Sequence, residues 1–211
     1  MRRVAPPLAW LVLLLAAAWL MPVLEPLFGA LAPDRGTVIY PRASFLSLLG
    51  EHLAIVGVAA TMAIVIGVGA AIVVTRPAGS EFLPLVSQLA SIGQTFPPVA
   101  VLALSVPALG YGPSAVVVAL VLYGLLPIVR NTLAGLKAVD RGVVESARGI
   151  GLSPGQVLWQ VELPIAAPAI LGGIRTSVTI NIATAAIGST IGANTLGDPI
   201  ISGIVNNNIA F

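Results

Sequence analysis

Long apolar runs constrain this chain more than any other feature of its sequence. A helix needs about 20 mostly apolar residues to cross the hydrocarbon core of a bilayer, which is ~30 Å thick. Lipid offers no hydrogen-bond partner to an open backbone, and no strand-like alternation is visible, so the runs predict helices. We expect an all-α polytopic membrane protein with about six transmembrane helices, over residues 8–24, 53–74, 83–109, 114–129, 163–191 and 199–211. The sixth run reaches Phe211 after 13 residues, too few to cross, so we expect the rest of a helix beyond it.

The composition excludes a soluble globule and several kinds of chemistry. Hydrophobic residues make up 57% of the chain and charged residues 9%, against roughly 25% charged in ordinary soluble domains. There is no cysteine and only one histidine, His52, so thiolate metal sites, redox chemistry and a histidine cluster are excluded. The net charge of +2 is too small for a nucleic-acid-binding surface, and we expect no nucleic-acid partner.

The N-terminal run has two interpretations. Arg2 and Arg3, the apolar stretch 8–20 and the small residues 16–18 resemble a cleaved secretory signal. The apolar stretch continues through Trp19 to Pro22, past a usual cleavage site, which favours a retained anchor helix. We therefore divide the chain into an anchor helix with an extracytoplasmic segment over 1–50 and a membrane core over 51–211.

Positive residues predict the orientation of the spans. If the amino terminus is cytoplasmic, alternation of the spans places only Arg35 and Arg42 outside, and Arg175 falls within the fifth run. Residues 130–162 then form the largest cytoplasmic loop, where a cytoplasmic partner would have to bind. The cytoplasmic side receives seven positive residues, as the positive-inside rule requires: Arg2, Arg3, Arg76, Arg130, Lys137, Arg141 and Arg148.

Ionisable residues indicate what does not drive this protein. All eight acidic residues lie outside the apolar runs or at their ends, whereas ion-coupled carriers place a carboxylate at membrane depth. The only lysine, Lys137, lies between Leu136 and Ala138 and is not part of a phosphate-binding G-x-x-x-x-G-K-[ST] loop. The spans hold no acid–base pair or metal triad. We expect no catalytic or metal-binding residues, and any ATP to be hydrolysed by another chain.

The long cytoplasmic loop predicts two short helices. Asp140 caps the first, and Gly149 and Gly151 end it. Ser153 and Gln156 have the spacing of a capping box for the second helix, with Pro154 at its first position. Apolar residues of the first helix recur at helical spacing, so one of its faces either docks in a groove of another protein or lies on the bilayer: Val143, Val144, Ala147 and Ile150.

The same loop resembles a known signature. Glu145-Ser146-Ala147, Gly151 six residues after Glu145, and Val161-Glu162-Leu163-Pro164 are similar to the E-A-A-x(3)-G-x(9)-I-x-L-P pattern of permease subunits of ATP-binding-cassette importers. The resemblance implies the type I importer permease fold, with this loop seated in a cleft of the ATPase subunit. It assigns coupling to Glu145, Ser146, Ala147, Arg148, Gly151, Val161, Leu163 and Pro164.

Further segments resemble one branch of that family. Residues 94–104, 123–132 and 172–175 are similar to permeases of importers for glycine betaine, choline, carnitine or proline, and the resemblance covers about 53–204. The family pattern G-A-G-G-L-G is replaced by G-A-N-T-L-G at 192–197. Threonine resists a left-handed backbone, so we expect this outer loop to differ in shape from its relatives.

The resemblance implies a permease subunit of an ATP-driven importer in the bacterial inner membrane. An extracytoplasmic binding protein would deliver the osmoprotectant, a cytoplasmic ATPase dimer would hold ATP and Mg²⁺, and a second permease subunit, identical or homologous, would complete the pore. This chain itself would hold no cofactor. The alternatives are a permease of the same fold for an amino acid such as methionine, and a membrane scaffold subunit that transports nothing.

Polar residues within the runs are the candidates for a substrate pathway. Aromatic residues make up only 5% of the chain and most stand singly, so no aromatic cage for a quaternary amine is visible. Serine and threonine in membrane helices also bond their own backbone or hold helices together, and this remains the alternative. We expect Arg175 to find a carbonyl or a carboxylate partner. The pathway candidates are Ser91, Gln94 and Thr95 on the third run and Asn181 and Thr184 on the fifth.

Overall fold

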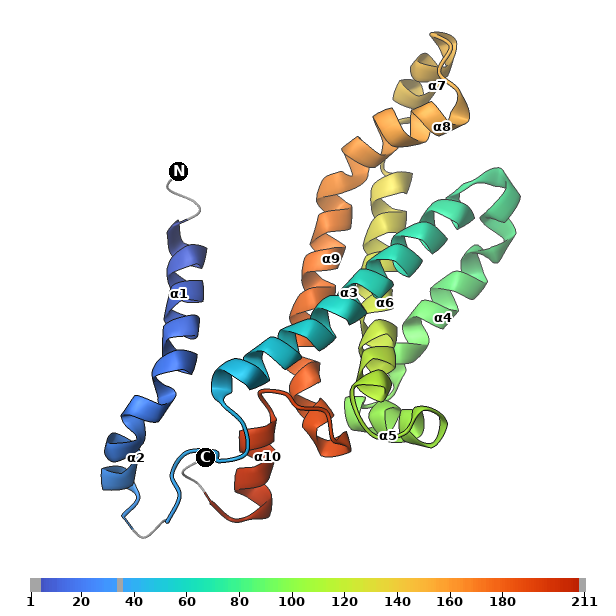
Figure 1. The fold of residues 1–211 in the computed structure, drawn as a ribbon. Coiled ribbons are helices and arrows are strands. Elements are labelled where there is room, and N and C mark those ends of the chain that lie inside the picture. The colour runs from blue at the N-terminus through green and yellow to red at the C-terminus, as the bar shows by residue number, and fades with distance from the viewer. Residues whose placement is uncertain (1–4, 34–35, 209–211) are drawn as a thin grey trace.

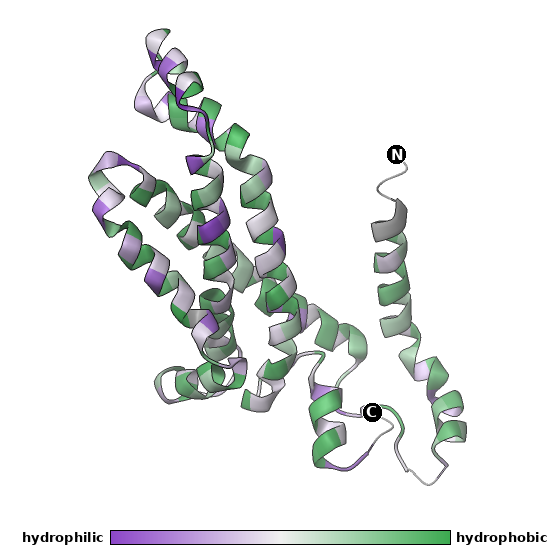
Figure 2. Ribbon diagram, turned by 180° about the vertical axis from the view of Figure 1, so that it is seen from behind, coloured by the Kyte–Doolittle hydropathy of each residue, from purple (hydrophilic) through white to green (hydrophobic). Residues whose placement is uncertain are grey.

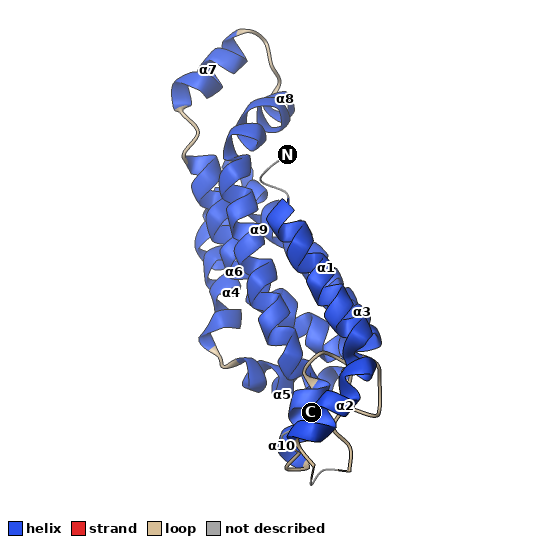
Figure 3. Cartoon of the chain, turned by 90° about the vertical axis from the view of Figure 1, so that its left-hand side faces the viewer, coloured by secondary structure: helices blue, strands red, loops and turns tan. Residues whose placement is uncertain are grey.

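The computed structural model describes residues 5–33 and 36–208, and in these ranges the chain forms helices and loops and no strand (Figures 1 and 3). The all-α prediction is confirmed. Arg2, Arg3 and Arg35, which entered the orientation argument, lie outside the described residues, as do positions 209–211 of the sixth run.

An N-terminal arm stands beside the remaining helices (Figure 1). It consists of α1 (Ala5–Leu20), a 3-10 turn η1 (Met21–Leu24) and α2 (Glu25–Leu31), and α1 contacts α3. Most of its large apolar side chains are exposed, Trp10 and Trp19 to about 70% each. An apolar helix with this exposure requires lipid or another protein around it.

The core of the molecule is a bundle of three long helices, α3 (Phe45–Thr75), α6 (Pro113–Lys137) and α9 (Leu163–Ala185). α6 lies between the other two, and 67% of its most apolar stretch is buried. Small residues bring the helices close together, because a methyl group at Gly173 of α9 would lie 2.7 Å from the Pro127 carbonyl oxygen of α6. The exposed surface along the helices is mainly hydrophobic (Figure 2).

The third predicted span is not one continuous helix. After the 3-10 turn η2 (Pro77–Phe82), α4 (Leu83–Thr95) returns along the bundle and α5 (Pro98–Leu109) turns across its end (Figure 1). The backbone is extended at Phe96 (ψ 148°) and Pro97 (ψ 143°), because proline disfavours the helical conformation in the residue before it. This interruption at Pro97-Pro98 divides residues 83–109 into two helices of 13 and 12 residues.

The described residues contain four helical segments long and apolar enough to cross a membrane, rather than about six: Leu8–Leu31, Phe45–Thr75, Pro113–Lys137 and Pro154–Ile191. The run over 83–109 is not among them because it is divided into helices of 13 and 12 residues. The sixth run, which was expected to be incomplete, contains α10 (Asp198–Val205) of 8 residues, followed by a turn at Asn206–Asn208.

The two ends of the bundle differ in character. One end carries α7 (Arg141–Gly149), α8 (Pro154–Val157) and a π-helical turn, η3 (Leu158–Glu162), and many hydrophilic residues gather there (Figure 2). The other end carries α2, α5, α10 and the 3-10 turn η4 (Ala186–Ile191) (Figure 1). The loop singled out by the sequence therefore projects from one end of the bundle.

Candidate functional site

The first helix of the loop has the predicted boundaries. The Asp140 carboxylate accepts hydrogen bonds from the backbone N–H groups of Gly142 (2.7 Å) and Val143 (3.3 Å), which caps α7 at its N-terminus. The helix ends at Gly149, so both predicted end signals lie where the helix stops.

Gly151 closes the turn after α7. Its φ is +94°, and no atom lies within 4 Å of the position that a Cβ would occupy. The Gly151 N–H donates to the Arg148 carbonyl (2.9 Å) and the Leu152 N–H to the Ala147 carbonyl (3.2 Å). This pair of bonds is a Schellman motif, which requires a left-handed residue at the glycine position. The strain of a substitution here would come from the backbone alone.

The second helix begins at the predicted capping box. Ser153 Oγ accepts from the Gln156 N–H (3.4 Å), Gln156 Oε1 accepts from the Ser153 N–H (2.8 Å), and Pro154 occupies the first turn. The chain then passes through η3 into α9. The two caps fix the helix–turn–helix shape of the loop through local bonds.

Most of the predicted coupling residues are accessible to a partner. Glu145, Ser146, Arg148, Gly151 and Pro164 are exposed, Val161 and Leu163 are half-buried, and Ala147 is buried.

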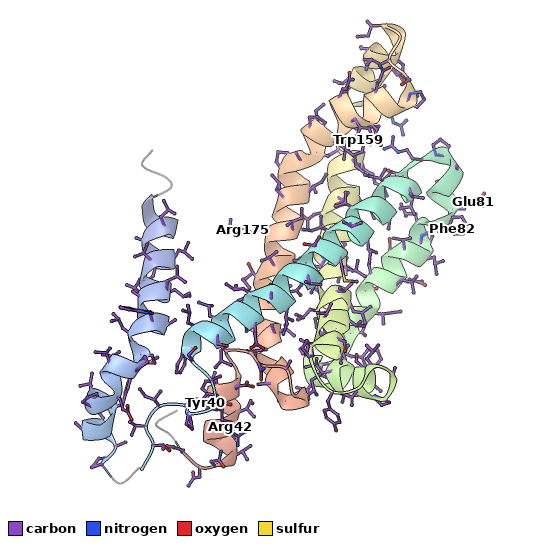
Figure 4. All side chains as sticks on the ribbon, viewed as in Figure 1. Tyr40, Arg42, Glu81, Phe82, Trp159 and Arg175 are labelled. Atoms are coloured by element: carbon purple, nitrogen blue, oxygen red, sulfur yellow. The ribbon has the colours of Figure 1, made fainter. Side chains whose placement is uncertain are left out.

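The apolar face predicted for α7 is divided. Ala147 is buried and Val144 is half-buried, whereas Val143 is 44% and Ile150 82% exposed. Val143 and Ile150 are seven positions apart and share the outer side of the turn, because two helical turns separate them. Trp159, labelled in Figure 4, is also exposed at this end of the molecule.

An ion pair joins the base of the loop to α3. Arg76, the residue after α3, donates from Nη1 to Glu162 Oε2 at 2.7 Å, and the Glu162 side chain is only 11% exposed. The pair borders a cavity of about 670 Å³ that lies between α7 and the end of α3. Its charged lining residues are Arg76, Lys137, Arg141, Glu145, Arg148 and Glu162. No local pattern in the sequence predicts this pair, because 86 positions separate its members.

Gln94 bonds to a backbone carbonyl that lacks its usual hydrogen bond within the helix because of a proline. Pro127 has no N–H for the Tyr123 carbonyl four residues earlier in α6, and Gln94 Nε2 donates to that oxygen at 3.0 Å. The Tyr123 hydroxyl donates to the Phe96 carbonyl at the α4–α5 break. Tyr123 was not a predicted site residue, although its position four residues before Pro127 is a visible signal. These two bonds hold the break against α6.

The other pathway candidates on α4 bond their own helix. Ser91 Oγ donates to the Gln88 carbonyl (2.7 Å) and Thr95 Oγ1 to the Ser91 carbonyl (3.0 Å). Gln94 and Thr95 are exposed and Ser91 is half-buried.

The candidates on α9 are buried. Asn181 is 0% exposed and Thr184 8% exposed, and neither amide atom of Asn181 has a hydrogen-bond partner within the described part of the chain. A Cβ at Gly124 would lie 3.2 Å from Asn181 Nδ2 and 2.5 Å from Ser177 Oγ. One candidate from each helix therefore reaches the same turn of α6, Gln94 at Tyr123 and Asn181 at Gly124.

The outer loop accommodates its threonine without a left-handed backbone. Gly192 supplies the left-handed residue (φ +81°), and Thr195 is buried with its hydroxyl oxygen accepting from the Gly197 N–H at 3.1 Å. Among described non-glycine residues only Asn207 has a positive φ, so neither Asn194 nor Thr195 is strained. No group of three or more His, Cys, Asp or Glu side chains suited to a metal ion occurs in the described ranges.

The bundle and its projecting loop are those of a membrane-embedded transport component. Comparison with known proteins assigns the chain to a family. Residues 63–211 match the family model described as binding-protein-dependent transport system inner membrane component, and the chain belongs to this family. It is therefore a component of a transport system and not an enzyme, as the sequence predicted.

Characterised relatives specify the branch. The chain is 44% identical over 166 residues to the osmoprotectant import permease protein OsmY of Salmonella typhimurium, covering 79% of this chain and 70% of the relative. It is 40% identical over 155 residues to the glycine betaine/carnitine/choline transport system permease protein OpuCB of Bacillus subtilis. The match covers 74% of this chain and 70% of the relative. The predicted resemblance to osmoprotectant permeases is confirmed.

Solved structures show the same fold. The inward-facing methionine transporter MetNI aligns with a TM-score of 0.66 at 25% identity, over 75% of this chain and 79% of that chain. An amino acid ABC transporter with histidines aligns with a TM-score of 0.62 at 22% identity, over 78% of this chain and 80% of that chain. The type I importer permease fold, which the loop signature implied, is confirmed.

Proposed function

We propose that this chain is the permease subunit of an ATP-driven importer for a small osmoprotectant: a quaternary amine such as glycine betaine, choline or carnitine, or proline. An extracytoplasmic binding protein delivers the solute. The chain is embedded in the bacterial inner membrane, and residues 51–211 form the transport core.

The loop geometry carries this proposal. α7 and α8 form a capped helix–turn–helix that projects from the bundle, with Glu145 exposed and Gly151 in the left-handed conformation. Such a rigid projection fits a cleft in a partner, and the exposed Val143 and Ile150 supply apolar contact area. The partner is an ATPase dimer that binds ATP and Mg²⁺, and the exposed members of the coupling set named from the sequence form this contact.

The substrate pathway runs beside the turn of α6 at Tyr123 and Gly124. Gln94 reaches this turn from the exposed end of α4, where Thr95 is also exposed, and Asn181 reaches it from α9, which also carries Thr184. Ser91 supports the α4 side through its bond within the helix.

An osmoprotectant is favoured over an amino acid as the cargo. The permeases named for osmoprotectants, choline or carnitine are 36–44% identical to this chain, whereas the methionine transporter is 25% identical. A scaffold role is disfavoured because these relatives are themselves named as transport permeases.

Reconstitution tests the proposal directly. The permease, its ATPase and its binding protein are placed in liposomes, and uptake of radiolabelled glycine betaine, choline, carnitine, proline and methionine is measured with and without ATP. We expect ATP-dependent accumulation of at least one osmoprotectant and none of methionine.

Two results would contradict the proposal. Accumulation of methionine alone would identify an amino-acid permease. An intact assembly that hydrolyses ATP but accumulates none of the solutes would identify a subunit without transport activity.

A further inference from the structure

Aromatic side chains converge on a cavity at the end of the molecule opposite α7 and α8. The cavity has a volume of about 340 Å³ and lies between the N-terminal arm, the segment before α3 and the start of α10. Figure 4 places Tyr40 in this region, between α2 and α10. The wall is formed by Met21, Phe28, Val38, Ile39, Tyr40, Phe45, Leu196, Pro199 and Ile200.

Three of the 11 aromatic residues in the chain line this one cavity. Phe28 belongs to α2, Tyr40 to the connecting segment, and Phe45 is the first residue of α3. The rings come from separate elements, so no aromatic cage was visible in the sequence. Val38 and Tyr40 are 6% and 8% exposed, so this part of the wall is held in place by packing.

The wall has the chemistry of a site for a quaternary ammonium group. Such a group cannot donate a hydrogen bond, and it is attracted to the electron-rich faces of aromatic rings. Its methyl groups match apolar side chains, and the polarizable thioether of Met21 suits the same surface. No Lys or Arg among the described residues lines the cavity to repel a cation.

One acidic residue stands next to the wall in the sequence. Asp198 directly precedes the wall residue Pro199. Burial raises the pKa of the Asp198 carboxyl; the Thr195 backbone hydrogen bond lowers it, nearby Glu51 raises it, and Arg42 lowers it. Asp198 therefore brings a carboxyl group close to the wall along the chain, and Arg42 already acts on its charge.

The tail after α10 is tied to the connecting segment. Asn208 Nδ2 donates to the Thr37 carbonyl at 2.9 Å, which fastens the chain after α10 to the segment that supplies Val38, Ile39 and Tyr40. The cavity is thus built by parts of the chain that are held together, and a ligand need not assemble it.

We propose that this cavity binds the quaternary ammonium head group of the cargo on the side of the permease opposite the coupling loop. The proposal rests on the proposed function in one respect only, the identity of the cargo. It adds a contact made by the permease itself, where the binding protein alone would otherwise recognise the ammonium group.

Direct binding is the test. The full chain in lipid nanodiscs is titrated with tetramethylammonium and with 3,3-dimethyl-1-butanol, the neutral carbon analogue of choline, and binding is followed by saturation-transfer NMR. We expect tetramethylammonium to bind and the neutral analogue to bind at least fivefold more weakly. Phe28→Leu and Phe45→Leu should each weaken tetramethylammonium binding five- to tenfold, and Phe45→Tyr should retain it.

A matched control uses an aromatic residue outside the cavity. Tyr111 is 78% exposed and does not line the wall, so Tyr111→Leu should leave binding unchanged. Equal binding of the neutral analogue would overturn the proposal and identify an apolar pocket for a lipid or detergent chain. Absence of tetramethylammonium binding, unchanged binding in both Leu variants, or equal loss in Phe45→Tyr would overturn it as well.

Uptake separates this proposal from the proposed function. Transport of a quaternary amine with an unchanged KM in Phe45→Leu would exclude the cavity as a binding site for the cargo. The assignment of the chain to an importer would be unaffected. Ring-dependent binding of tetramethylammonium, together with uptake of methionine alone, would show an ammonium site that does not serve the cargo, and would exclude both the osmoprotectant assignment and the role of the cavity in cargo binding.

Discussion

Gly151 shows how one backbone conformation determines the shape of the loop. An L-residue in the left-handed region costs about 1 kcal/mol or more relative to glycine. We expect Gly151→Ala to reduce and Gly151→Arg to abolish retention of the ATPase, because a change in the turn displaces the exposed residues of α7. Co-purification of the ATPase with tagged permease measures the effect, with membrane insertion scored in parallel.

Gly149 provides the matched control two positions earlier. It lies in α7 without a positive φ, and no atom lies within 4 Å of the position that a Cβ would take there, so Gly149→Ala should keep the ATPase. If Gly151→Arg inserts normally and retains the ATPase at wild-type stoichiometry, the coupling assignment is wrong.

Residues differ in how far their sequence neighbourhood determines their role. Asp140 and the Ser153–Gln156 pair were predictable because a cap is bonded to its own helix within three residues. Gln94 was recognised as a polar residue at membrane depth, but its partner was not, because the Tyr123 carbonyl belongs to a different helix. Local bonds follow from local sequence, whereas contacts between helices depend on how the helices pack.

The Arg76–Glu162 ion pair connects two elements, α3 and the π-helical turn before α9. A charge-assisted hydrogen bond contributes about 1.5–3 kcal/mol to the free energy of unfolding. The lower end of this range applies to Arg76–Glu162 because the Arg76 side chain is 31% exposed to solvent. We expect Arg76→Gln to lower the thermal unfolding temperature and to reduce ATPase-coupled uptake, since Glu162 would remain buried without its partner. The exchange Arg76→Glu with Glu162→Arg should recover part of both.

Arg141 is the matched control for this pair. It lines the same cavity but makes no ion pair within the described residues, so Arg141→Gln should change the unfolding temperature little. A charge exchange no better than the single variants would show that the two charges do not act as a pair.

At the level of elements, apolar runs predicted helices well and their continuity less well. The runs over 53–74 and 114–129 lie within α3 and α6, which extend farther at both ends because polar residues near the bilayer surface also join a helix. The run over 83–109 became two helices, since Pro97 and Pro98 act on the backbone whatever the hydropathy of their neighbours.

Arg175 bears on the surroundings of the whole molecule. The expected carbonyl or carboxylate partner is absent among the described residues: Arg175 is exposed and extends from α9 on the side away from α6 (Figure 4). Gly172, Thr176 and Thr179 are exposed at helical spacing around it. A guanidinium at the middle of a span is costly in lipid, so we infer that this face of α9 borders water or the proposed second permease subunit.

Thiol labelling tests that inference, since the chain has no cysteine of its own. In the reconstituted assembly we expect Thr179→Cys to react with a hydrophilic maleimide or to crosslink to the second subunit. Val65→Cys, on the 68% exposed apolar side of α3, should do neither because lipid covers it. Equal inertness of both cysteines would place the Arg175 face in lipid.

Orientation in the membrane is the last property that the charges predict for the whole molecule. Among described residues outside the spans' interior, Arg76, Lys137, Arg141 and Arg148 lie toward the α7 end, whereas Arg42 lies at the opposite end. The positive-inside rule therefore places α7 in the cytoplasm, where an ATPase can reach it. In intact cells Ser153→Cys should resist a membrane-impermeant thiol reagent and react after permeabilisation, whereas Thr37→Cys, exposed at the other end, should react at once. Labelling of Ser153→Cys from outside would reverse the topology and exclude the coupling role of the loop.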